Sequence, residues 1–273
     1  MQMAGMLLGG ILWGILGDKK GRVKILFGSI FLYSIANTAN GFVNSIEGYA
    51  TWRFIAGIGL AGELGAGVTL VLENLPRHSR GYGTMIVATV GVSGAILANY
   101  VAKAFDWRMA YFIGGGLGML LLILRISVYE SGMYKKMEEK DVSRGNFLSL
   151  FTNRKRLFKY MNSILIGLPI WFCVGILITF SPEFAKTMNV PDPISAGQAV
   201  MFCYIGLVFG DFASGFLSQI LKSRKKVVLL FLILSALSIA GYFMLDGASA
   251  SLFYSICGFI GFAVGYWAIF ITI

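Results

Sequence analysis

Charged residues are scarce in this sequence: aspartate, glutamate, lysine and arginine make up only 13% of its 273 residues. A soluble domain carries about 25%. Apolar side chains instead come in runs of about twenty, the length that crosses a hydrocarbon core of about 30 Å. Backbone groups in lipid must be bonded within the protein, so these runs predict helices, because a β-barrel would show short alternating segments. The composition therefore predicts an all-α membrane protein.

Histidine and cysteine are also rare. The single histidine, His78, lies in a short polar connection, and the three cysteines, Cys173, Cys203 and Cys257, lie inside apolar runs without metal-ligand spacing. We interpret the cysteines as packing residues. No nucleophile–base pair, metal constellation or Walker-type phosphate loop is visible. We therefore predict no catalytic residue, no metal, no cofactor and no enzyme activity.

The apolar runs predict nine spans, and one long polar segment separates the first five from the last four. We place the first bundle at 1–129, a central cytoplasmic loop at 130–158 and the second bundle at 159–273. The end of the central loop is read either as a helix at the membrane interface or as a solvated basic linker. The spans are predicted at residues 1–16, 24–43, 49–72, 81–103, 108–128, 158–181, 195–221, 226–245 and 250–273.

The net charge of +10 would suit nucleic acid, but its distribution indicates membrane topology instead. Of the 23 lysines and arginines, 19 fall in connections on one side of the predicted spans. Basic residues gather in cytoplasmic loops. We therefore predict no nucleic-acid partner and an integral protein of the bacterial inner (plasma) membrane, with its N-terminus outside and its C-terminus cytoplasmic.

A glycine-rich basic motif follows the first span: Gly14-Ile-Leu-Gly-Asp18-Lys-Lys-Gly21-Arg22-Val-Lys. Gly14 would allow close helix packing and Gly21 a tight turn, and Asp18 could meet Arg22. The motif resembles the signature loop between the second and third spans of the major facilitator superfamily. A weaker copy around Gly215, in the seventh predicted span, has Gln219 in place of Asp18. The two copies predict repeated halves of parallel topology.

A second match begins at Arg53-Phe-Ile-Ala-Gly-Ile-Gly59-Leu-Ala-Gly-Glu63 and continues with Glu73-Asn-Leu-Pro-Arg-His-Ser-Arg-Gly. It is similar to the fourth span and following loop of the sugar-porter and metabolite–proton symporter branches. The resemblance implies two helical bundles and transport by alternating access, without ATP or bound cofactor. The Gly-Pro pair typical of antiporters is missing from the run that starts at Gly91, which favours symport or facilitated diffusion.

Counted from the signature loop, the nine spans correspond to family spans two to ten of an expected twelve. The first and last two family spans would then lie outside this sequence. Asp18 resembles a residue whose helix partner, span eleven, belongs to the missing set. We therefore expect either a fragment or a truncated gene product, and expect the chain alone not to catalyse vectorial transport.

Ionisable side chains at membrane depth are costly and are functional candidates by default. Arg53 could attract an anionic substrate or only extend to the interface. Glu63 lies near mid-span on a stripe of small residues, where a buried carboxyl prefers to be neutral and could carry a proton. The alternative is a structural carboxyl bonded to a neighbouring helix. Ten residues place Arg53 and Glu63 about 15 Å apart along the helix, so we predict no ion pair between them.

Two further positions complete the candidate set. Asp211 lies one turn before Gly215, and the resemblance implies gating rather than substrate contact for this pair, as for Gly14, Asp18, Gly21 and Arg22. Tyr266 and Trp267 in the last span could line a cavity, although aromatic residues in membrane helices are more often packing residues. Arg53, Glu63, Tyr266 and Trp267 are thus the candidates for substrate or proton binding.

These observations predict a secondary active transporter that moves a small polar solute, such as a sugar, an organic acid or an osmolyte. The predicted partners are the solute, protons and the lipid bilayer, and proton symport is favoured. The alternative is a non-transporting membrane sensor or an inactive transporter fragment.

Overall fold

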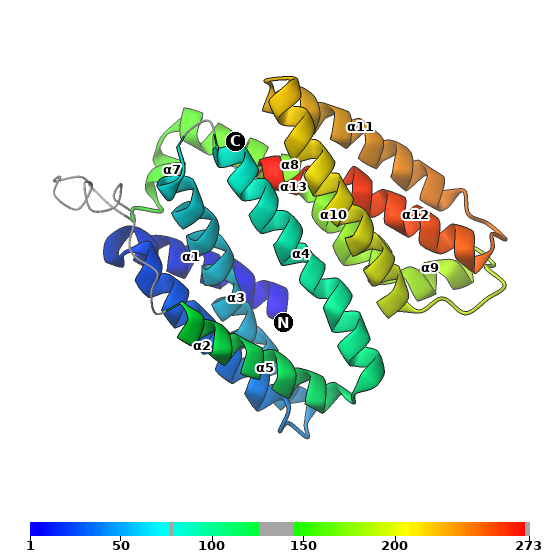
Figure 1. The fold of residues 1–273 in the computed structure, drawn as a ribbon, viewed down its shortest axis with the longest axis horizontal. Helices are drawn as coiled ribbons and strands as arrows, with labels where there is room; N and C mark the ends of the chain where they lie inside the picture. The colour runs from blue at the N-terminus through cyan, green and yellow to red at the C-terminus, as the bar shows by residue number, and fades with distance from the viewer. Residues whose placement is uncertain (77–78, 126–144, 271–273) are drawn as a thin grey trace. The chain divides into compact units, whose positions relative to one another are not determined.

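The computed structural model describes residues 1–76, 79–125 and 145–270 as a set of helices, with no strand among them (Figure 1). Each predicted span corresponds to one helix or to two consecutive helical segments. The elements are α1 Gln2–Lys20, α2 Arg22–Asn40, α3 Ile46–Asn74, α4 Arg80–Ala104, α5 Trp107–Leu124, α7 Ser149–Thr152, α8 Arg154–Phe172, the π-helix η1 Cys173–Ile178, α9 Ser181–Thr187, α10 Ala196–Ile220, α11 Arg224–Phe243, α12 Ala250–Ala263 and α13 Trp267–Phe270.

Seven of the described helical stretches are long and apolar enough to cross a membrane. The first two predicted spans, α1 and α2, fall outside this set, although each has 19 residues. Charged side chains at the turn that joins them, Asp18 to Lys20 and Arg22 to Lys24, reduce the apolar stretch of both. The two helices still pack with α3 in the way their glycines predict.

Short polar residues set several helix starts. The Ser45 hydroxyl accepts a hydrogen bond from Gly48 N at 3.1 Å at the start of α3. Asp106 Oδ1 accepts one from Met109 N at 3.0 Å at the start of α5. Such caps satisfy amides that have no partner inside the helix. The sequence therefore fixes these boundaries locally.

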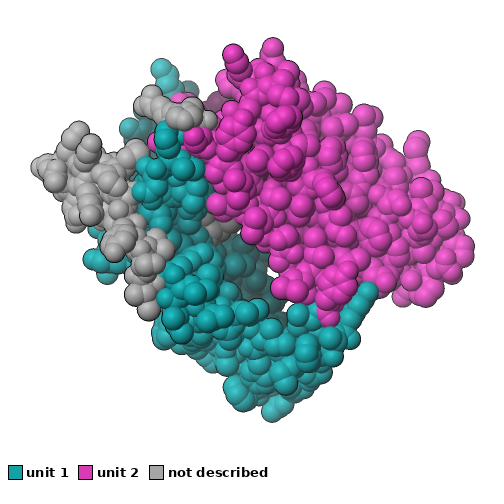
Figure 2. All heavy atoms as spheres, in the orientation of Figure 1, with its two compact units in different colours: residues 1–76, 101–156 teal, residues 77–100, 157–273 magenta. Residues whose placement is uncertain are grey.

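Two compact units make up the chain, coloured separately in Figure 2. The first comprises Met1–Pro76 and Val101–Arg156, and the second Arg77–Tyr100 and Leu157–Ile273. Most of α4 thus belongs with the C-terminal helices. Of the central loop predicted at 130–158, residues 130–144 lie outside the described residues, so the predicted boundary stays a prediction, while α8 begins inside the loop, at Arg154.

Glycines bring the helices of the first unit together. A Cβ added at Gly5 or Gly9 of α1 would collide with the backbone of Phe54 or Ile58 in α3. On α3, Gly59 lies against the backbone of Tyr33 in α2. Small residues let membrane helices approach this closely. The stripe predicted beside Glu63 is therefore a helix-packing surface.

The second unit has the larger buried core. It gathers side chains from η1, α10, α11 and α12, and includes Leu177, Cys203, Phe231, Phe253 and Ile260, all at most 2% exposed. The α10–α12 contact again uses glycine: a Cβ at Gly206 would collide with the Gly258 carbonyl, and one at Gly261 with the Cys203 carbonyl.

Two of the predicted spans are not continuous α-helices. The span from 158 passes from α8 into the π-helix η1 a few residues after Pro169, whose missing N–H removes a helix bond. The last predicted span, 250–273, is interrupted between α12 and α13 at Val264, Gly265 and Tyr266. Gly265 lies against the backbone of Gly210 and Asp211 there. The sequence is apolar on both sides of this interruption, so hydropathy alone predicted one continuous span.

Candidate functional site

The signature loop forms a small charge network. Gly21, which joins α1 to α2, has φ = 99°, a conformation that residues with a Cβ rarely adopt. The turn brings Arg22 Nη1 to 2.7 Å from Asp18 Oδ1, as predicted. Arg22 Nε also lies 3.4 Å from Glu73 Oε1 at the end of α3. Asp18 is 47% exposed and Glu73 11%. Arg22 therefore connects the turn to α3 through Glu73, the more buried of the two carboxylates.

Gly14 does not pack closely among the described residues, since a Cβ there would meet nothing within 4 Å. The structure gives that role on α1 to Gly5 and Gly9 instead. The signature motif alone did not distinguish these glycines, because all of them fall in one apolar run.

Glu63 lies in an ion pair that the sequence did not predict. Its Oε1 is 3.3 Å from Nη2 of Arg125, the residue that ends α5. Both side chains are largely buried, 23% exposed for Glu63 and 29% for Arg125. Tyr33 of α2 is close enough to interact electrostatically with both. Three helices therefore contribute to one polar cluster, Tyr33–Glu63–Arg125.

Arg125 has donor capacity left in this cluster. Its Nη1 is buried and has no hydrogen-bond partner within the described part of the chain. A guanidinium offers five N–H donors in a planar fork that matches a carboxylate. From the sequence, Arg125 is one of the 19 basic residues assigned to the cytoplasmic side, since it lies at the end of its apolar run.

Arg53 lies at the other end of the α3–α5 pair. Its guanidinium stands over the ring of Tyr111 in α5, 5.9 Å from the centroid. The Tyr111 hydroxyl shares a 2.9 Å hydrogen bond with that of Tyr49. Arg53 and Glu63 thus both contact α5, but at residues 111 and 125, about 21 Å apart along the helix. The expectation that they do not pair is confirmed.

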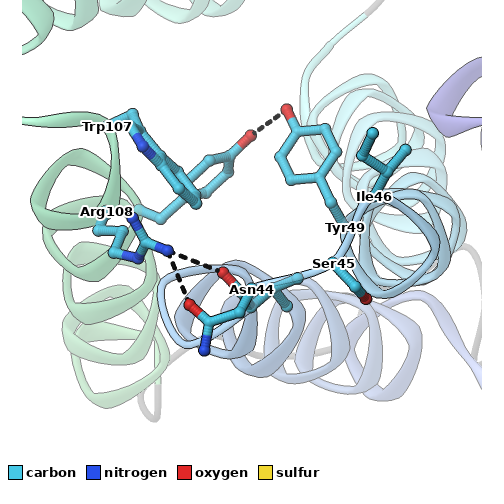
Figure 3. Close-up of a pocket in the computed structure, with 8 residues that line it drawn as sticks. Asn44, Ser45, Ile46, Tyr49, Trp107 and Arg108 are labelled. Atoms are coloured by element: carbon cyan, nitrogen blue, oxygen red, sulfur yellow. Dashed lines mark hydrogen bonds between the residues drawn. The ribbon is translucent and has the colours of Figure 1, made fainter.

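A pocket of ≈ 460 Å³ opens beside these tyrosines. Figure 3 shows Arg108 reaching across it to the α2–α3 connection, where Nη2 donates to Asn44 Oδ1 at 2.9 Å and to the Val43 carbonyl at 3.2 Å. The Arg108 guanidinium also covers the Trp107 ring at 4.2 Å. Sequence reasoning did not single out this group. Its aromatic residues suit a membrane–water interface.

In the second unit, Asp211 is completely buried. Its Oδ1 accepts a hydrogen bond from Ala268 N at 3.1 Å, across the break between α12 and α13. Its Oδ2 is buried without a partner among the described residues. Gly215, one turn later, faces Met85 of α4, since a Cβ there would lie 2.7 Å from Met85 Cγ.

Tyr266 and Trp267 flank the same break. Tyr266 is fully buried, and its hydroxyl donates to the Ile166 carbonyl of α8 at 2.7 Å. It therefore ties the break to α8. Trp267 is partly exposed and packs against the second core. Asp211 therefore contacts the break through Gly265 and Ala268, the neighbours of Tyr266 and Trp267, whereas Arg53 and Glu63 lie at two other places.

The described residues hold no group of three or more histidine, cysteine, aspartate or glutamate side chains arranged for a metal ion. His78 lies outside them. Cys173, Cys203 and Cys257 are buried and free.

The sequence profile of the Major Facilitator Superfamily matches residues 1–273. Among curated relatives, a probable 4-methylmuconolactone transporter of Cupriavidus pinatubonensis is 27% identical over 96% of this chain and 61% of its own length. The niacin transporter NiaP of Acinetobacter baylyi is 33% identical over 48% of this chain and 30% of its own. The chain thus spans less than two thirds of these relatives.

Among solved structures, the partially occluded inward-open form of the xylose transporter XylE from E. coli superposes with a TM-score of 0.66. The match covers 98% of this chain and 72% of XylE at 16% identity, a likeness that concerns the fold. The profile match over the full sequence and the shared helical fold agree. The chain therefore belongs to the Major Facilitator Superfamily of integral membrane proteins.

Proposed function

We propose that the protein is a secondary transporter that carries a small carboxylate together with protons. The observation that carries this proposal is the Glu63–Arg125 ion pair, in which a carboxylate within α3 meets a largely buried guanidinium at the end of α5, with one guanidinium nitrogen unused among the described residues. Such intramembrane charges mark ion and substrate pathways. Family membership supports transport, and the pair supports coupling.

The coupling follows from the charges. With Glu63 ionised, Arg125 is neutralised within the protein. A proton on Glu63 removes the negative partner and leaves the guanidinium to attract another anion. An approaching carboxylate would find two donors of Arg125 in a fork. Proton and anion would therefore favour each other's binding, which is the thermodynamic requirement for symport.

The substrate class rests on the arginines and on the relatives. Arg53 and Arg108 lie near the predicted outer surface beside aromatic rings, a combination that suits a flat or apolar anion. The relatives include proteins named for niacin, 4-methylmuconolactone, sialic acid and proline or betaine. Carboxylates are common among these compounds. A sugar remains the comparison substrate because the fold is shared with a xylose transporter.

The test is uptake by inside-acidic and outside-acidic membrane vesicles that contain the protein expressed from its complete gene. A panel of aromatic and aliphatic carboxylates, betaines and sugars would be compared. We expect a carboxylate to be concentrated along the proton gradient. In Glu63→Gln, which cannot titrate, concentration should be lost while exchange of bound substrate persists.

Glu183→Gln is the matched control, since Glu183 is an exposed carboxyl on α9. It should transport as the wild type does. Concentrative uptake by Glu63→Gln would exclude Glu63 as the coupling group. A preference for sugars over every carboxylate would exclude the proposed substrate class.

A further inference from the structure

A fully buried carboxyl in the second unit has no charge partner, although burying an ionised carboxylate is expensive. Asp211 is 0% exposed, and no lysine or arginine of the described residues forms an ion pair with it. An isolated buried carboxylate is strongly disfavoured unless it is paired or takes up a proton. This group has one hydrogen bond, from Ala268 N to Oδ1, and Oδ2 has none.

The bond to Ala268 replaces one that the helix break removes. In a continuous helix the Ala268 amide would bond to the carbonyl of Val264. Here the turn at Val264–Tyr266 interrupts the helix, and the amide donates to Asp211 instead. Gly265 permits this approach, because a Cβ at that position would lie within 2.6 Å of Asp211 N. The carboxylate is therefore part of what holds the break.

A second buried oxygen without a partner lies at the same level, on α4. Contacts between α4 and α10 follow one antiparallel register: Gly81 with Gln219, Met85 with Gly215, and Asn99 with Met201. In each pair the two residue numbers add to 300. The register places Thr89 opposite Asp211. Thr89 Oγ1 is buried and has no hydrogen-bond partner among the described residues, as is true of Asp211 Oδ2.

Other titratable groups around α10 lie away from Asp211. On the packed elements they are thiols and phenols, or charged groups in α9 and at the ends of α4, α10 and α11, which lie about 12 Å or more away along the helix axes. Tyr266 lies in the break itself, and its hydroxyl is directed to the Ile166 carbonyl. The set comprises Cys203, Tyr204 and Lys222 with α10, Tyr254, Cys257 and Tyr266 with α12 and the break, Cys173 in η1, Arg224, Lys225, Lys226 and Tyr242 in α11, Glu183 and Lys186 in α9, and Arg80, Tyr82, Tyr100 and Lys103 in α4.

We infer that Asp211 and Thr89 form a second proton-binding site, at which protonation of the buried carboxyl weakens its hold on the α12–α13 break. Asp211 accepts from Ala268 N through Oδ1, while Oδ2 and Thr89 Oγ1 have no partner among the described residues and face each other across the α4–α10 register. A proton taken from water onto Oδ2 turns that oxygen into a donor toward Thr89 Oγ1 and is returned to water on release. The remaining carbonyl oxygen is a weaker acceptor, since hydrogen bonds to ionised groups are about twice as strong.

This site is independent of the Glu63–Arg125 pair and of the proposed substrate. Its consequence is local: the segment Val264–Phe270 should open more often when Asp211 is protonated. Asn at position 211 imitates the protonated state permanently, because it is neutral and keeps a carbonyl acceptor. The inference can therefore be tested without any transport measurement.

The experiment is amide hydrogen exchange of the purified protein across a pH series, with protection calculated against an unstructured peptide at each pH. In the wild type, protection of 264–270 should fall several-fold as pH decreases, while that of 250–260 stays constant. Asp211→Asn should show the low-pH protection at every pH. The control Asp192→Asn makes the same change at an exposed loop residue and should behave as wild type.

Thr89 is tested as a positioning residue. Thr89→Val, which keeps the shape without the hydroxyl, should displace the midpoint of the pH response, and Thr89→Ser should restore it. Should Asp211→Asn not fold, Asp211→Glu, which retains a titratable group, must keep the pH response. Protection that is independent of pH in the wild type, or that depends on sodium instead, would overturn the inference.

Discussion

At the scale of single residues, the charged groups of the first unit differ in burial, and burial decides what each should contribute. The Arg22–Asp18 pair is short at 2.7 Å but its carboxylate is 47% exposed. The Glu63–Arg125 pair is longer at 3.3 Å, yet both partners are at most 29% exposed. Exposed pairs contribute about 0–1 kcal/mol, whereas removal of one partner from a buried pair costs about 3–5 kcal/mol.

We predict that Glu63→Gln and Arg125→Gln each lower the free energy of unfolding by about 2 kcal/mol, between those limits. The double variant should cost less than the sum of the two, since each single change leaves one charge without its partner. A double-mutant cycle of thermal stability in detergent measures the difference. Additive effects would show that the pair is not coupled in the folded protein.

For Asp18, the exposed position predicts a kinetic rather than a structural effect. Asp18→Asn should change stability by less than about 1 kcal/mol, because the pair with Arg22 is half exposed and Arg22 retains Glu73. We expect slower turnover with substrate affinity within a few-fold of wild type, measured as initial uptake rate against equilibrium binding. A large loss of affinity at normal turnover would place Asp18 in the substrate site instead.

At the scale of elements, α10 and α12 cross with their backbones nearly in contact. A Cβ on Gly206 would collide with the Gly258 carbonyl, and the neighbouring backbone has no flexible side chain that could move aside. Forcing extra atoms into a packed core costs about 1–3 kcal/mol. Because a backbone cannot move aside, Gly206→Ala should destabilise the protein by about 3 kcal/mol, the upper end of this range, measured as a lower melting temperature in detergent.

The matched control is Gly241→Ala, at a helical glycine of α11 with nothing within 4 Å of the added Cβ. Alanine is the better helix former by up to about 1 kcal/mol, so this variant should be as stable as wild type or slightly more so. An equal loss of thermal stability in the two variants would mean that these glycines contribute backbone flexibility rather than close helix packing.

The helices were largely predictable from the sequence because the surrounding solvent is the hydrocarbon of a membrane. A segment in hydrocarbon must be apolar and must bond its backbone internally, so long apolar runs such as those of α3 and α10 predict helices. The break at Val264–Tyr266 could not be predicted, because Gly265 differs from other helical glycines only in what it contacts. The residue that stabilises the break is Asp211, which bonds to Ala268 N but lies 54 residues before Gly265 in the sequence.

The same limit applies to the candidate site. Glu63 and Asp211 were identifiable, since an acidic residue in an apolar run is exceptional. Arg125 was not, because it ends its run and looks like a loop residue, and its contact spans 62 positions in sequence. The intrinsic chemistry of a residue is visible in the sequence, whereas its partner depends on helix packing.

At the scale of the whole molecule, orientation in the membrane is set by charges that face water rather than by packing. Lys222 lies between α10 and α11, and Arg224, Lys225 and Lys226 begin α11. The connection between α9 and α10 carries Asp192 without a basic residue. A lysine-rich loop is retained on the cytoplasmic side. Successive spans must then place the two connections on opposite sides.

The last prediction tests this orientation. Cysteine at Lys225 should react only with thiol reagents that cross the membrane, and cysteine at Asp192 should react with impermeant reagents added to intact cells. The native cysteines need no removal, because Cys173, Cys203 and Cys257 are each 0% exposed, and the unlabelled parent protein is the control for them.

Ser143, in the long basic connection, is predicted to be cytoplasmic as well but lies outside the described residues. Labelling of Lys225→Cys from outside, with protection of Asp192→Cys, would reverse the assignment. The cluster Tyr33–Glu63–Arg125 would then lie toward the outer surface, and the direction from which Glu63 first meets a proton would be reversed with it.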